Sequence, residues 1–179
     1  MEQQIETSNS VTTRSVGIRY GAISAVIGIA YFVILNVAQI DMTQGFWNWF
    51  GWIITILMIV LAHKYFKDNG DGFMSYGQGI GIAFWLGLIS GTISSIFTYL
   101  YVKFIDGNML ETIKERQIEG MQSKGMSEEQ IDQAMKISAM FTSAEAILVF
   151  GFIGSIAGAL IIALIVTIFT QKKSPETTF

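Results

Sequence analysis

Four long stretches without a charged side chain or a histidine constrain this sequence more than any other feature. They comprise 21, 21, 31 and 26 residues, at positions 20–40, 42–62, 72–102 and 146–171. The hydrocarbon core of a bilayer is about 30 Å thick, and a helix that rises about 1.5 Å per residue crosses it in about 20 residues. Each stretch is therefore long enough to span a membrane, and the sequence predicts an integral membrane protein.

The composition agrees with this prediction and excludes several other classes of protein. Apolar residues make up 51 % of the 179 residues and charged residues only 14 %, against about 25 % in soluble domains. The chain has no cysteine, which excludes disulfides, thiol nucleophiles and iron–sulfur sites. The formal net charge of −3 argues against a nucleic-acid partner, which favours a basic surface. The partner that the composition indicates is the lipid bilayer, and no cofactor is predicted.

The chain divides into one membrane domain, residues 16–173, between a polar N-terminal tail, 1–15, and a C-terminal tail, 174–179. The first apolar segment is too long for a signal-peptide core and lacks an A-x-A cleavage site, so we interpret it as a retained span. The only proline, Pro175, lies in the C-terminal tail, so proline breaks none of the spans. The predicted spans lie at about residues 16–39, 46–62, 74–105 and 144–170.

A polar insert, residues 106–140, separates the third and fourth predicted spans and contains seven acidic and four basic residues. Ser127 with Gln130 three residues later is typical of a helix start, and Gly125 suits the end of a preceding helix. Near one face of that preceding helix lie Leu110, Ile113, Gln117 and Met121. We therefore predict an all-α integral membrane protein, a four-transmembrane-helix bundle with an amphipathic helical hairpin between the third and fourth spans.

Basic residues predict which side of the membrane each end of the bundle faces. Six of them flank the N-terminus of the first span, the loop after the second span and the end of the fourth span: Arg14, Arg19, Lys64, Lys67, Lys172 and Lys173. The loop between the first two spans has none. The positive-inside rule therefore places both termini in the cytoplasm and the insert outside. Five basic residues in or beside the insert oppose this assignment weakly: Lys103, Lys114, Arg116, Lys124 and Lys136.

The glycines of YGQGIGIAFWLGLISG, residues 76–91, resemble a phosphate-binding loop only superficially. A dinucleotide fingerprint has the spacing G-x-G-x-x-G, whereas this stretch reads G-x-G-x-G followed by Ile82. Small residues four positions apart instead share one helix face and let a neighbouring helix approach closely. We therefore predict helix-packing positions at three pairs: Gly77 with Gly81, Gly87 with Gly91, and Gly154 with Gly158. Packing within the chain, homodimerisation and a ligand groove all remain open for these faces.

Polar side chains in the predicted spans are the candidates for a pathway across the membrane. They are Ser90, Ser94 and Thr98 in the third span, and Glu145 at the head of the fourth. An ionisable group at membrane depth often marks an ion site. The alternatives are structural, because hydroxyl groups bond to carbonyls of their own helix and a carboxylate complements a helix N-terminus.

No constellation of residues predicts catalysis. His63, the single histidine, follows the second span beside Lys64 and has no H-E-x-x-H spacing, so we expect it at the membrane interface. There is no G-x-S-x-G motif, and the acidic pairs fall in the insert. The sequence therefore predicts a protein that is not an enzyme, with no catalytic, metal-binding or cofactor-binding residue.

Three segments carry a resemblance to the bacterial family called domain of unknown function 4199. They are GQGIGIAFWLGLISGTISSIFTYLY, KGMSEEQIDQAMK and FGFIGSIAGALIIALI. The resemblance extends from about Thr13 to Lys173. It implies a small four-span protein of the cytoplasmic (inner) membrane of a Gram-negative bacterium, with a charged helical insert before the last span. It implies no functional residue.

The leading functional prediction is a non-catalytic accessory or scaffolding component of the envelope, which binds another membrane protein. It follows from the missing catalytic residues, the small-residue helix faces and the polar insert. The alternative is a small transporter or channel subunit that acts as a homo-oligomer.

Overall fold

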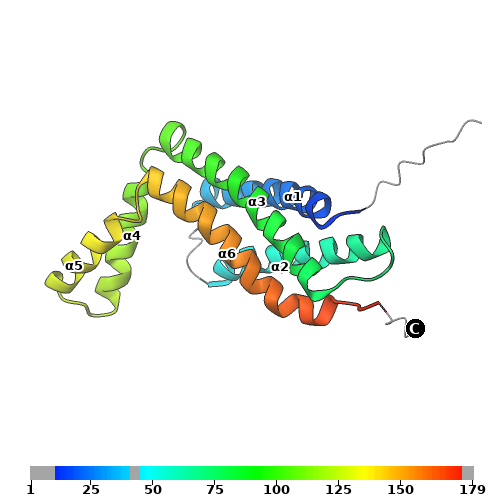
Figure 1. Ribbon diagram of the computed structural model, residues 1–179. Coiled ribbons are helices and arrows are strands. Elements are labelled where there is room, and N and C mark those ends of the chain that lie inside the picture. The colour runs from blue at the N-terminus through cyan, green and yellow to red at the C-terminus, as the bar shows by residue number, and fades with distance from the viewer. Residues whose placement is uncertain (1–10, 41–44, 175–179) are drawn as a thin grey trace, which may run out of the picture.

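The computed structural model describes residues 11–40 and 45–174, and this part of the chain forms six helices (Figure 1). The predictions made for residues 1–10, 41–44 and 175–179 lie outside the described residues. The helices are α1 (Thr13–Val37), α2 (Gly45–Asp68), α3 (Tyr76–Phe104), α4 (Met109–Ser123), α5 (Glu128–Ala139) and α6 (Ala144–Thr170). The same residues contain no strand, so the predicted all-α class is confirmed for them.

Capping residues start several of these helices. In α1, α3 and α5 the cap side chain and the side chain of the third helical residue each bond the other's backbone N–H, an arrangement called a capping box. The pairs are Thr12 with Ser15, Ser75 with Gln78, and Ser127 with Gln130. The helix start predicted at Ser127 is therefore confirmed. Just before it, Gly125 has a φ of 75°, a left-handed conformation that glycine adopts without steric cost and that ends α4.

Helix α2 extends further than the span predicted at about residues 46–62, because it ends at Asp68. Lys67 lies in its last turn, where a positive charge complements the helix dipole. The Lys67 ammonium also donates to the backbone carbonyl of Thr170, at 2.8 Å. The loss of hydropathy after residue 62 thus marks the limit of the apolar segment and not the end of the helix.

Helix α3 is the centre of the bundle, with α1 packed on one side of it and α6 on another. Glycines bring both neighbours close. A Cβ atom at Gly21 of α1 would lie 2.8 Å from the carbonyl oxygen of Leu86, and one at Gly87 of α3 would lie 2.9 Å from the Cβ of Ala159. A real side chain essentially never approaches another atom so closely, so both contacts require glycine.

The hydrophobic core lies in the half of the bundle that contains the C-terminal part of α2 and the start of α3. Its largest fully buried apolar side chains include Ile59, Met74, Ile82 and Leu86. The backbone of Met74, just before α3, pairs with that of Lys172, just after α6, through two hydrogen bonds of 2.8 and 2.9 Å. This bridge joins the end of the chain to the loop between α2 and α3.

The outer surface of α1, α2, α3 and α6 is strongly apolar. All four helices are long and apolar enough to cross a membrane. Large hydrophobic side chains are exposed along each of them, among them Val26, Trp49, Ile96 and Ile161. A soluble monomer rarely leaves so much contiguous apolar surface in water. These observations support a membrane protein.

Helices α4 and α5 form a separate unit that projects from one end of the four long helices (Figure 1). They pack mainly on each other. The Ser138 hydroxyl of α5 donates to the side-chain oxygen of Gln117 of α4, at 2.7 Å, and Ile131 is the buried residue of the pair. Lys136 and Asp132, one helical turn apart on α5, form an ion pair at 2.7 Å.

Candidate functional site

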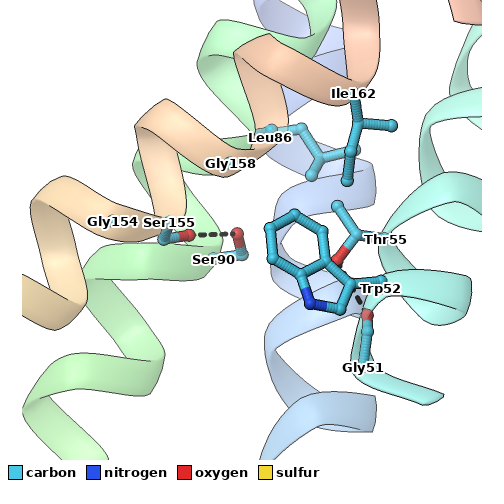
Figure 2. Close-up of a pocket in the computed structure, with 10 residues that line it drawn as sticks. Gly51, Trp52, Thr55, Leu86, Ser90, Gly154, Ser155, Gly158 and Ile162 are labelled. Carbon is cyan, nitrogen blue, oxygen red and sulfur yellow. Dashed lines mark hydrogen bonds between the residues drawn. The ribbon is translucent and has the colours of Figure 1, made fainter. Parts of the chain in front are cut away.

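A pocket of about 210 Å³ opens between the N-terminal part of α2 and the α3–α6 pair (Figure 2). All the buried residues of α2 for which burial is described lie from Ile59 onward, so its N-terminal part leaves a gap beside α6. Small residues keep that gap open, because a Cβ at Gly51 or Gly154 would meet no atom within 4 Å. The lining residues are Gly51, Trp52, Thr55, Leu86, Ser90, Gly154, Ser155, Gly158, Ala159 and Ile162.

Three hydroxyl groups in this pocket donate to backbone carbonyl groups. Thr55 donates to the carbonyl of Gly51, at 3.0 Å, and Ser155 donates across the helix interface to the carbonyl of Gly87, at 3.1 Å. Ser90 has longer contacts, 3.4 Å to the carbonyl of Gly87 and 3.4 Å to the Ser155 hydroxyl. Since each hydroxyl has one hydrogen and two lone pairs, the pocket presents hydrogen-bond acceptors.

The four residues predicted to line a pathway are not brought together. Ser90 lines the pocket and is buried, whereas Ser94 and Thr98 of the same helix are not among its lining residues. Glu145 lies at the start of α6, where its carboxylate is 3.5 Å from the ammonium of Lys103 and is largely exposed.

The predicted packing glycines fall into three groups. Gly87 and Gly91 lie against α6, and a Cβ at Gly91 would be 2.8 Å from that of Ser155. Gly77 and Gly154 would meet no atom within 4 Å, so the structure places no helix against these two positions. At the remaining two, an added Cβ would make ordinary van der Waals contact, with Thr13 at Gly81 and with Trp52 at Gly158, both at 3.8 Å.

Gly79, which the four-residue spacing did not select, is a close-packed glycine of α3. A Cβ there would lie 2.9 Å from the Thr167 hydroxyl and 3.3 Å from the imidazole of His63. Positions two apart on a helix point in nearly opposite directions, so Gly79 faces α6 whereas Gly77 and Gly81 face away. At the start of α3, the four-residue spacing therefore identified small residues but not the helix face that packs against α6.

His63, which the sequence predicts at the membrane interface, is fully buried inside the protein. Its Nε2 atom lies 3.0 Å from the carbonyl oxygen of Gly79, and its Nδ1 atom 2.8 Å from the Thr170 hydroxyl. A carbonyl oxygen only accepts, so Nε2 carries the hydrogen of this bond. His63 therefore links α2 to both α3 and α6. Beside it, the buried Thr167 hydroxyl has no hydrogen-bond partner in the described structure.

No cluster suited to a metal ion occurs within residues 11–40 and 45–174, where no three His, Cys, Asp or Glu side chains come together.

The family model described as "Protein of unknown function (DUF4199)" matches residues 19–172. The chain belongs to this family. The match covers α1 from Arg19 onward and all of α2 to α6, and it confirms the resemblance drawn from the sequence. Neither a curated protein nor a solved structure matches the chain.

Membership in DUF4199 assigns no role to any residue, so the evidence that the pocket is a functional site comes from its geometry alone. Sequence reasoning selected Ser90, Gly154 and Gly158 for other reasons and did not place them in one pocket. Trp52 lines the pocket from α2. The sequence feature most closely related to the pocket was the series of small residues from Gly151 to Ala159 in the fourth span. This series does not show that the N-terminal part of α2 forms the opposite wall of a pocket.

Proposed function

We propose that this DUF4199 protein is a multi-pass, non-catalytic accessory protein of the cytoplasmic membrane of a Gram-negative bacterium. In this proposal it binds another envelope protein through the α4–α5 unit. The four apolar helices support the multi-pass assignment. Arg14, Arg19, Lys64, Lys67 and Lys172 lie at the bundle end opposite α4 and α5, which supports cytoplasmic termini and an external α4–α5 unit.

The exposed apolar surface beside α4 and α5 is the observation that carries this proposal. Ile137 is 59 % exposed, Met140 65 % and Phe141 50 %, and all three lie at the C-terminal end of α5 and the turn after it. Phe141 contacts Phe150 of α6, with ring centroids 4.9 Å apart, and all three side chains are still half or more exposed. An amphipathic hairpin that keeps its own fold and leaves this strip open is suited to contact a partner.

The charge of the insert favours a protein partner over the lipid surface. Residues 106–140 contain seven acidic and four basic side chains. An anionic membrane surface attracts basic segments and repels acidic ones. A partner with an apolar patch and a basic rim matches the strip and the charges around it.

In-cell photo-crosslinking tests this proposal. A photoreactive residue at Ile137 is expected to give one discrete crosslinked protein, and one at Glu129, an exposed polar position on α5, is expected to give none. Replacement of residues 109–139 by a short flexible linker should abolish recovery of that partner while the four long helices keep their thermal stability. Crosslinks from Ile137 to lipid alone would contradict the proposal, as would recovery that survives the replacement.

The alternative of a transporter or channel subunit has less support. It requires Ser90, Ser94, Thr98 and Glu145 to share one path, and Ser90 alone of the four lines the pocket. Uptake of ions or solutes by liposomes that contain the purified protein would favour this alternative.

A further inference from the structure

The pocket between α2, α3 and α6 is lined by residues from the apolar lengths of three helices that can span a membrane. Trp52, which lines it, is 47 % exposed, and Ile53 beside it and Ile161 on α6 are also exposed. Hydrocarbon is therefore the medium that adjoins the open side of the pocket. Any occupant reaches it through the bilayer.

The size of the pocket restricts what can occupy it. A helix with its side chains is about 10–12 Å across, too wide for a volume of about 210 Å³ to hold one. A protein cavity of about 150 Å³ lined by apolar side chains accepts benzene. The volume of about 210 Å³ here therefore suits a ring or a short length of hydrocarbon chain. The apolar walls for such a group are Trp52, Leu86 and Ile162.

The hydroxyl groups restrict the occupant further. Thr55 and Ser155 use their hydrogens on backbone carbonyls and present lone pairs. Ser90 is only 9 % exposed, and both of its contacts are 3.4 Å long, beyond the usual 2.5–3.0 Å range of an O–H···O bond. A donor from the occupant therefore has acceptors available at Ser90 and Ser155. In hydrocarbon such a donor has no water to bond instead.

We propose that this pocket binds a lipid-soluble molecule that combines an apolar ring or chain with a hydroxyl group. The apolar part lies against Trp52, Leu86 and Ile162, and the hydroxyl donates to Ser90 or Ser155. Gly154 and Gly158 leave the space that the molecule fills. This proposal does not depend on the role of the α4–α5 unit.

Photo-labelling of the full-length protein in lipid nanodiscs tests the binding. The probe is a diazirine-bearing long-chain alcohol, and the labelled residues are mapped by mass spectrometry. We expect labelling of the segments around Trp52 and Ile162, with competition by unlabelled hexadecanol. Gly154→Leu fills the pocket without a clash at Cβ and should abolish the labelling. Gly28→Leu is the matched control, because Gly28 also faces open space but lies on α1, outside the pocket.

A second comparison tests the hydroxyl group. Hexadecane should compete roughly two- to tenfold less well than hexadecanol, as the loss of one hydrogen bond predicts. A Ser90→Ala, Ser155→Ala double variant should remove this difference. Labelling that persists in Gly154→Leu would overturn the pocket assignment, and equal competition by both compounds in the unmodified protein would overturn the hydroxyl requirement.

Discussion

Gly87 determines how closely α3 approaches α6. Its missing side chain admits Ala159 and the backbone of α6, whereas Gly77, ten residues earlier on the same helix, faces open space. The two glycines have the same chemistry and belong to the same predicted motif, so they form a matched pair for mutation.

Gly87→Leu should destabilise the bundle by about 1–3 kcal/mol or more, because an added side chain forces α3 and α6 apart. Gly77→Leu should leave the free energy of unfolding nearly unchanged, because a Cβ there meets no atom within 4 Å. Reversible unfolding in mixed micelles measures both variants. Similar losses in the two proteins would contradict the placement of Gly87 against α6.

Thr167 is the second residue whose environment makes a clear prediction. Its hydroxyl is buried beside Gly79 and His63 without a hydrogen-bond partner, and such burial costs about 1–3 kcal/mol. Thr167→Val keeps the shape and removes the hydroxyl, so it should raise the free energy of unfolding by about 1 kcal/mol. The same unfolding measurement checks it. Destabilisation by this substitution would show that the hydroxyl has a partner in the folded protein.

At the scale of the elements, the α4–α5 unit is a local structure held by its own caps. The Ser127 hydroxyl accepts a hydrogen bond from the backbone N–H of Gln130, at 3.3 Å, and the Gln130 side chain accepts one from the N–H of Ser127, at 2.9 Å. Few contacts connect the unit to the long helices. Its stability should therefore vary independently of theirs.

Ser127→Ala should cost about 1 kcal/mol, and the cost should fall on α5. Hydrogen exchange followed by mass spectrometry should show faster exchange in residues 128–139 and unchanged exchange in α3 and α6. Ser123→Ala, at an exposed serine near the end of α4, is the control. Faster exchange throughout the protein would mean that the unit and the bundle unfold together.

At the scale of the whole molecule, the antiparallel order of the helices sorts the charges. The start of α1, the end of α2 and the end of α6 share one end of the bundle. There the Arg19 guanidinium donates to the Tyr65 hydroxyl at 2.8 Å, and Lys67 donates to α6. The opposite end carries Lys103, Glu145 and the acidic α4–α5 unit. This separation is the basis of the proposed orientation.

Single-cysteine labelling tests the orientation, and the chain offers a clean background because it has no cysteine of its own. Asn69→Cys marks the loop between α2 and α3, and Ser123→Cys marks the α4–α5 unit; both positions are exposed. A membrane-impermeant maleimide should label the second variant in intact cells and the first only after the cells are permeabilised. The reverse pattern would place the termini outside.

Local sequence patterns located most of the helical elements. The charge-free stretches located the four apolar helices, because a bilayer sets their length, and Ser127 with Gln130 located the start of α5, because a cap is made between residues three apart. The same patterns missed the C-terminal part of α2, where His63 is buried inside the protein and Lys67 bonds α6. Charge near a helix end does not distinguish an exposed residue from one that a neighbouring helix covers.

What the sequence determined by itself was the class of the protein, since hydropathy and capping act within one segment and need no knowledge of the neighbours. What only the tertiary structure decided was which faces meet. Pairs of glycines spaced four apart begin at Gly77, Gly87 and Gly154, yet of these three residues Gly87 alone lies in close contact with another helix, and Gly154 borders a pocket. The pocket exists because α2 is buried only through its C-terminal part, and small residues such as Gly51 and Gly154 leave space beside its N-terminal part. Such a gap depends on the relative placement of three helices, and residue spacing within one helix carries no information about it.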